Sequence, residues 1–309
     1  MALTILYKTV IMLFLIAVGI LCSKTKLISE ASNKELSKFV LQVVNPVVIF
    51  MSYQTDYRTE LVRNLLLTFV ISIGAISAAV LLAYVFVRKK QGREFEIERF
   101  SATYSNCGFM GIPLVNAVYG DEGVFYLTAF ITVFNIFVWT HGVILISGEK
   151  NFKQVVKVFY SPTIIAIVLG IISFFLHFRL PAPAEEALSL IKELNTPLAM
   201  LVSGVTIAGT NVLKMLKNYR VYYVCLLKLL IIPLIIAVPL SLLTGIDDKI
   251  RMTVLVAAAA PPAAICTLFS LRYGKNSIYA SEIFAAGTIL SVGTLPLVVE
   301  ATEYLTKIL

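Results

Sequence analysis

The chain has 309 residues, of which 59% are hydrophobic and 14% are charged, and its mean hydropathy is +0.89. This balance excludes a soluble globular domain, because most of the surface of such a chain faces lipid rather than water. Ten apolar spans of about 20 residues, each able to cross a hydrocarbon core of ~30 Å, leave no room for a soluble catalytic domain.

We expect an all-α integral membrane protein with ten transmembrane helices. The first apolar run is long and lacks an Ala-x-Ala-like cleavage site, so it predicts a retained helix rather than a signal peptide. The predicted spans are residues 5–22, 36–53, 64–87, 100–119, 123–147, 155–178, 189–210, 221–244, 251–271 and 277–300.

The two halves of the chain carry matching landmarks about 151 to 154 positions apart. Each half has five predicted spans, so the second half must enter the membrane in the opposite orientation. The pattern predicts two inverted five-helix repeats, residues 1–150 and 151–309, an organisation found in many secondary transporters. The matched landmarks are Gly19 with Gly170, residues 46–52 (PVVIFMS) with 197–203 (PLAMLVS), and Tyr119-Gly120 with Tyr273-Gly274.

Lysine and arginine are distributed unevenly between alternate loops, which predicts the orientation of the chain. Seventeen lie in one set of loops and eight in the opposite set, which includes both termini, so we expect both termini outside a cell membrane. This asymmetry also explains the net charge of +8 without nucleic-acid binding. The larger set is Lys24, Lys26, Lys34, Lys38, Arg88, Lys89, Lys90, Arg93, Arg99, Lys150, Lys153, Lys157, Lys214, Lys217, Arg220, Arg272 and Lys275.

Two predicted spans contain residues that interrupt a helix. Residues 100–119 include Gly108, Gly111 and Pro113, and residues 251–271 include Pro261-Pro262. Inside a helix, glycine costs about 1 kcal/mol and proline about 3 kcal/mol. Unwound backbone at membrane depth survives only where it is buried in protein or lines a watery cavity, so the two breaks predict the functional site.

If the two broken helices cross near the midplane, the N-termini of their half-helices point at one place, and their free N–H groups suit an anion, especially a carboxylate. The simpler interpretation is that each proline only kinks its helix. The corresponding positions of the breaks in both halves favour the crossing.

The run from Ser105 to Leu114 (SNCGFMGIPL) resembles the fourth-span signature of the auxin efflux carrier family. Asn45-Pro46, the double proline and the two Tyr-Gly pairs extend the resemblance over essentially the whole chain. The resemblance implies a scaffold of spans 1, 2, 6 and 7 that also forms a homodimer, and a moving transport bundle of spans 3–5 and 8–10. It also implies a substrate site where spans 4 and 9 cross.

By the resemblance, Asn106 and the backbone of residues 108–113 match the binding motif of the family. An amide both donates and accepts hydrogen bonds, so Asn106 suits a carboxylate or a hydroxyl group, and its alternative role is to satisfy freed backbone groups. Cys107 and Thr267 either line the cavity or let helices approach closely. Asn45 is a candidate for the site or for an interhelical hydrogen bond.

Two ionisable residues lie deep in predicted spans and are therefore functional candidates. Lys228 is a candidate for neutralising an anionic substrate or pairing with Glu282, and the alternative is that its side chain snorkels to the interface. Glu282 is a candidate for carrying a proton, binding sodium or neutralising Lys228. His141 is expected to be structural.

The sequence favours a secondary transporter for a small organic anion such as malate, malonate or an auxin-like acid. The alternatives are a sodium/proton-type cation antiporter on a related fold and a receptor that shares the fold. No HExxH, GxSxG or P-loop motif occurs, so we expect no catalytic residue, and no metal site or other cofactor. Coupling to sodium ions or protons stays open, and the expected partners are the organic acid, lipid and a second copy of the chain.

Overall fold

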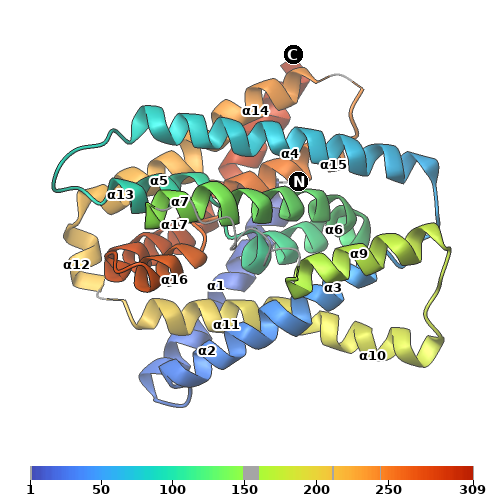
Figure 1. Cartoon of the computed structure of the whole chain (residues 1–309), viewed down its shortest axis with the longest axis horizontal. Helices are drawn as coiled ribbons and strands as arrows, with labels where there is room; N and C mark the ends of the chain where they lie inside the picture. The colour runs from blue at the N-terminus through green and yellow to red at the C-terminus, as the bar shows by residue number, and fades with distance from the viewer. Residues whose placement is uncertain (1, 149–159, 211, 244, 309) are drawn as a thin grey trace.

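The computed structural model describes residues 2–148, 160–210, 212–243 and 245–308, and every element in these ranges is a helix (Figure 1). The predicted boundary between the repeats, at residues 150 and 151, lies outside the described residues, as do Lys150, Lys153 and Lys157. The α-helices are α1 (Ala2–Lys24), α2 (Glu30–Phe39), α3 (Asn45–Ser52), α4 (Thr59–Phe86), α5 (Phe95–Thr103), α6 (Ile112–Phe137), α7 (Val143–Ser147), α9 (Pro162–Phe175), α10 (Ala182–Glu193), α11 (Asn195–Ala208), α12 (Val212–Lys217), α13 (Tyr219–Leu226), α14 (Ile232–Leu242), α15 (Asp248–Ala259), α16 (Ile265–Arg272) and α17 (Ser277–Ile308).

Six helical segments in the described ranges are long and apolar enough to cross a membrane, and α9 is a shorter apolar helix. Interruptions explain why other predicted spans fall short of that length: residues 100–119 and 251–271 each contain a break, and residues 189–210 are divided between α10 and α11. The six segments are Ala2–Lys24, Glu30–Ser52, Thr59–Phe86, Cys107–Ser147, Tyr219–Leu242 and Ser277–Ile308.

In the described part of the chain, four five-residue π-helical turns interrupt the regular helices, and three of them end two residues before a proline. These are η1 (Val40–Val44) before Pro46, η2 (Cys107–Gly111) before Pro113 and η4 (Leu227–Ile231) before Pro233; the fourth is η3 (Val138–Gly142). A proline lacks an N–H and its ring clashes with the carbonyl four residues earlier. A wider turn ahead of each proline lets the helix continue past it.

Two close contacts between the halves of the chain involve two pairs of residues with the same spacing of 151 positions. A Cβ atom on Gly204 of α11 would overlap the Ile16 carbonyl oxygen of α1 and lie 3.0 Å from Gly19 Cα, whereas one on Gly170 of α9 would overlap the ring of Tyr53. Gly19 lies 151 positions before Gly170, and Tyr53 lies 151 positions before Gly204. The packing of α1 on α11 therefore has its counterpart in the packing of α3 and Tyr53 on α9.

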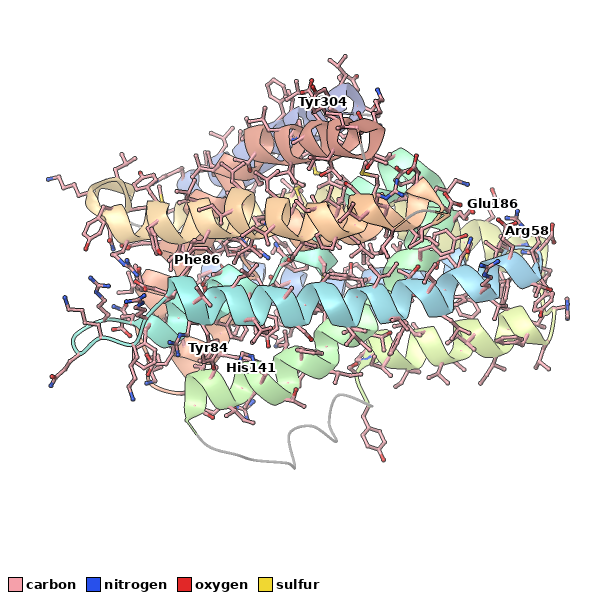
Figure 2. The ribbon with its side chains drawn as sticks, turned by 90° about the horizontal axis from the view of Figure 1, so that it is seen from above. Arg58, Tyr84, Phe86, His141, Glu186 and Tyr304 are labelled. Carbon is pink, nitrogen blue, oxygen red and sulfur yellow. The ribbon has the colours of Figure 1, made fainter. Side chains whose placement is uncertain are left out.

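Helix α4 runs along most of the molecule, with Arg58 just before one end and Phe86 at the other (Figure 2). At the Phe86 end, Tyr84 lies beside His141, and the hydroxyl groups of Tyr84 and Tyr104 lie 3.2 Å and 2.8 Å from the two ring nitrogens of His141. His141, in η3, thus joins α4 to Tyr104, which directly follows α5.

Candidate functional site

The two predicted helix interruptions lie against each other. The N–H of Asn106 donates to the carbonyl of Pro261 over 2.7 Å, and the N–H of Ala263 donates to the carbonyl of Tyr104 over 3.0 Å. Ser105 and Pro262 form an isolated antiparallel bridge. Segments more than 150 positions apart in the chain therefore satisfy each other's backbone groups inside the bundle, as unwound backbone at membrane depth requires.

The position of the second interruption, residues 260–264, agrees with the one predicted from Pro261-Pro262. The first prediction was wrong by several residues, because the break is at residues 104–106 and both Gly111 and Pro113 lie in helix. Pro113 is in the first turn of α6, where the missing N–H costs little, and the π-helical turn before it accommodates the ring.

Four half-helix ends meet at the paired interruptions. Helices α5 and α15 end there, at Thr103 and Ala259, and η2 and α16 begin there, at Cys107 and Ile265. Neither of the two starting helices has a side-chain cap. The ends of α5 and α15 bring partial negative charge from unpaired carbonyls, and the starts of η2 and α16 bring partial positive charge from N–H groups.

The side chain of Lys228 reaches the carbonyl side of this arrangement. Its ammonium nitrogen lies 3.1 Å from the Thr103 carbonyl oxygen, 3.0 Å from that of Ala258 and 2.6 Å from Ser105 Oγ. All three N–H donors of the ammonium group are therefore used within the protein. Lys228 is 1% exposed, so its side chain does not snorkel to the interface.

Three polar side chains at the interruptions have buried atoms without a hydrogen-bond partner. These atoms are Nδ2 of Asn106 and the Oγ1 atoms of Thr267 and Thr103, and Asn106 as a residue is 7% exposed. A buried donor left unpaired costs about 1–3 kcal/mol, so such groups mark places where a ligand or water completes the pairing. Asn106 lies immediately before η2 and Thr267 lies in the first turn of α16.

A pair of asparagines from the first and second halves lies beside the first interruption. Asn195 Nδ2 donates to Asn45 Oδ1 over 2.6 Å, and both residues are buried. A Cβ atom on Gly108 would lie 3.4 Å from Asn45 Nδ2, so the absence of a side chain at Gly108 lets the pair approach the start of η2. Asn45 therefore makes an interhelical hydrogen bond and also borders the candidate site.

The remaining predicted residues lie around the same place or on α17. Cys107 is buried, and a Cβ atom on Gly111 would lie 3.2 Å from the Cys107 Cβ atom. The ring of Pro262 packs where a side chain on Gly287 would otherwise be, which fixes α17 against the second interruption. Glu282 is buried on α17, and its role as a charge-bearing residue stays a prediction.

A model for a family described as membrane transport protein matches residues 4–299 of the chain. The chain belongs to the auxin efflux carrier family. It is similar to a putative malonate transporter of Rhizobium meliloti, with 24% identity over 272 residues that cover 84% of each chain. It is also similar to an uncharacterized transporter of Methanothermobacter thermautotrophicus, with 26% identity over 295 residues that cover 92% of this chain and 94% of that one.

A plant relative extends the comparison. Auxin efflux carrier component 5 of Arabidopsis thaliana is 22% identical over 253 residues, which cover 68% of this chain and 72% of the relative. Membership of the auxin efflux carrier family identifies the chain as a multi-pass membrane transporter rather than an enzyme.

Sequence reasoning missed two buried polar residues, one at the first interruption and one on α5, the helix that leads to it. Ser105 bridges the two interruptions, because its hydroxyl donates to the Ala258 carbonyl over 3.0 Å and accepts from Lys228. Glu98, 2% exposed on α5, forms an ion pair with Arg220 and accepts from the Tyr279 hydroxyl over 3.0 Å. Ser105 belongs to the signature SNCGFMGIPL, so the sequence offered a signal for it. Glu98 follows the basic residues at 88–93 together with Glu94 and Glu96, and only its burial distinguishes it from them.

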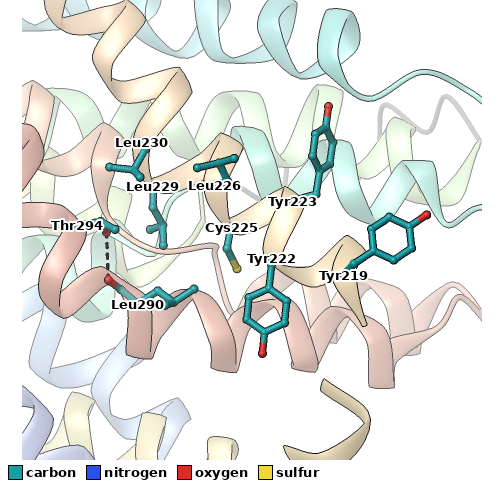
Figure 3. A pocket seen from close by; sticks show the side chains of 9 residues that line it. All are labelled: Tyr219, Tyr222, Tyr223, Cys225, Leu226, Leu229, Leu230, Leu290 and Thr294. Carbon is teal, nitrogen blue, oxygen red and sulfur yellow. Dashed lines mark hydrogen bonds between the residues drawn. The ribbon is translucent and has the colours of Figure 1, made fainter. Parts of the chain in front are cut away.

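A separate cavity of about 460 Å³ lies between α13, η4 and α17 (Figure 3). Its lining is mostly apolar, and the Thr294 hydroxyl is bonded to the carbonyl of Leu290 in its own helix. None of its lining residues belongs to the interruptions. The lining residues are Tyr219, Tyr222, Tyr223, Cys225, Leu226, Leu229, Leu230, Leu290 and Thr294.

Proposed function

We propose that this chain is a secondary transporter of a small organic anion, and that the anion binds at the paired interruptions. The observation that carries the proposal is the buried, unpaired Nδ2 donor of Asn106, which lies directly before an uncapped helix start. A carboxylate accepts hydrogen bonds from both kinds of donor and is favoured by the partial positive charge of a helix N-terminus.

The second interruption offers complementary groups. Thr267 Oγ1 is buried without a partner in the first turn of α16, whose start is also uncapped. Two N-terminal helix ends and two side-chain donors suit an acid with two oxygen-bearing groups better than a cation, which needs oxygen ligands. The name of the Rhizobium relative, a putative malonate transporter, agrees with this class, so malonate, malate and an auxin-like acid are the first substrates to test.

The proposed architecture has ten spans arranged as two inverted five-helix repeats. The related contacts of Gly204 with α1 and of Gly170 with Tyr53 support the repeat, as do the positive φ values of Gly120 and Gly274, +62° and +66°, at matched Tyr-Gly pairs. Spans 4 and 9 are the crossed, broken helices. The substrate reaches the site between the scaffold and the transport bundle, and is released after the bundle moves relative to the scaffold.

The scaffold of spans 1, 2, 6 and 7 also forms the proposed homodimer in the cell membrane, with both termini outside. Helix α9 exposes an apolar face, which suits contact with lipid or with the second copy of the chain. The exposed residues are Ile165, Val168, Leu169 and Ile172. Substituting these residues with serine tests the dimer separately from transport.

The test is uptake of radiolabelled malonate, malate and indole-3-acetate into proteoliposomes that contain the purified chain, against protein-free liposomes. Asn106→Ala should weaken substrate binding about tenfold or more, because it removes a hydrogen bond to a charged group. Asn33→Ala is the matched control, since Asn33 is also 7% exposed but donates to Thr206 away from the interruptions. Equal loss in both variants, or unchanged affinity in Asn106→Ala, contradicts the assigned site, and no flux of any organic acid contradicts the function.

A further inference from the structure

Three oxygen atoms converge on one buried point at the carbonyl side of the paired interruptions. They belong to the backbone of Thr103 near the end of α5, the backbone of Ala258 near the end of α15, and the hydroxyl of Ser105 between the half-helices. These oxygens come from both halves of the chain. Two of them belong to the last turns of helices, where the partial charge is negative.

Such a cluster of uncharged oxygens at two helix C-termini is a place that favours a cation. Here the cation is supplied by the chain, because the Lys228 ammonium group lies 2.6 to 3.1 Å from all three oxygens. A buried charge is stable only when its hydrogen-bonding capacity is met, and these three contacts meet it. The π-helical turn η4 carries Lys228, and Pro233 two residues after that turn fixes the turn in place.

We propose that Lys228 acts as a built-in monovalent cation at the paired interruptions, so that no sodium ion binds there and transport is independent of sodium. The lysine also ties α13 and η4 to both broken helices, which makes these elements one rigid body. Independence of transport from sodium rests on the proposed function, because it concerns the coupling of substrate transport to an ion. Occupation of the oxygen cluster by Lys228 rests on the three distances alone, so it is tested without a substrate.

The first experiment measures thermal unfolding of the detergent-purified chain in increasing sodium, potassium or propylammonium chloride, with choline chloride at equal ionic strength as the reference. The wild-type midpoint should be the same in all four salts. Lys228→Ala should lower the midpoint by about 5–10 °C in choline chloride, because it leaves the oxygen cluster uncompensated. One of the small cations should then restore it in a saturable way.

Lys249→Ala is the matched control. Lys249 forms an ion pair with Glu122 over 2.7 Å, but its side chain is 39% exposed, and it lies at the end of α15 opposite to the interruption. Its removal should change the midpoint little and create no cation dependence. A cation effect of the same size in both variants overturns the inference, because it shows a general salt effect rather than a vacated site.

Two measurements keep the inference testable if Lys228→Ala does not fold. Lys228→Gln keeps two N–H donors on a side chain that is one bond shorter and removes the charge, and it should also gain stabilisation by small cations; a salt-insensitive Lys228→Gln variant with wild-type stability overturns the proposal. The second uses the wild-type chain alone, in which saturable stabilisation by sodium, or uptake that requires sodium, overturns it. Absence of any organic-acid flux leaves the unfolding results valid, so the two proposals fail separately.

Discussion

Asn45 and Asn195 lie 150 positions apart in the chain, yet their side chains form one hydrogen bond, in which Asn195 Nδ2 donates to Asn45 Oδ1 over 2.6 Å. Asn45 lies directly before Pro46, and Asn195 lies two residues before Pro197. These prolines begin the two matched segments, residues 46–52 and 197–203. The pair joins α3 of the first half to α11 of the second half and borders Gly108 at the start of η2. It links the proposed scaffold to the candidate site.

The asparagine pair should behave as one unit in stability. Asn45→Ala and Asn195→Ala should each destabilise the chain by about 1–3 kcal/mol, because each leaves a buried amide group unpaired. The double variant should be more stable than the sum of the single effects predicts, by about 0.5–1.5 kcal/mol. Unfolding of all four proteins in the same detergent measures this coupling, and strictly additive effects would contradict it.

Close packing of α1 on α11 should depend on Gly204. Gly204→Ala places a methyl group on the Ile16 carbonyl oxygen, so the two helices must separate, at a cost of about 1–3 kcal/mol. Gly74→Ala on α4 has open space around it and should be neutral or slightly stabilising. Thermal unfolding of both variants checks the difference, and equal midpoints would show that α1 and α11 do not require this contact.

The two Tyr-Gly pairs should respond alike to substitution. Gly120 and Gly274 have φ values of +62° and +66°, a region that costs a residue with a side chain about 1–2 kcal/mol. Gly120→Ala and Gly274→Ala should therefore each destabilise the chain by about that amount, although neither new methyl group meets another atom. Gly293→Ala, which also has open space but lies in α17 without a positive φ, is the control.

The Glu98–Arg220 ion pair should contribute far more than a surface pair. The Glu98 side chain is 2% exposed and that of Arg220 is 17% exposed, so Arg220→Ala leaves a buried carboxylate with its main partner removed. We expect a loss of about 3 kcal/mol. Lys38→Ala breaks a pair with Glu35 in which the side chains are 61% and 71% exposed, and it should change stability by less than about 0.5 kcal/mol. Chemical unfolding of the two variants, compared with wild type, distinguishes these values.

The fold was predictable wherever the determining property is local. Hydropathy over a window of residues marks the long apolar helices, and Pro261-Pro262 marks the second interruption because a proline restricts its own helix. The first interruption was displaced from its prediction, because the π-helical turn η2 absorbs the effect of Pro113 while the backbone at Ser105 pairs with the other half of the chain. No local sequence pattern predicts that pairing.

The sequence by itself determined that the chain is a membrane protein of apolar helices and that its halves share landmarks. It also marked Asn106 and Lys228 as candidate functional residues. Only the tertiary structure decided what these residues touch. Lys228 meets Thr103 and Ser105 across 125 and 123 positions of the chain, and Asn45 meets Asn195 across 150. Contacts of this kind depend on how helices pack and on where a side chain then reaches, whereas hydropathy and proline restriction are properties of a short stretch of chain.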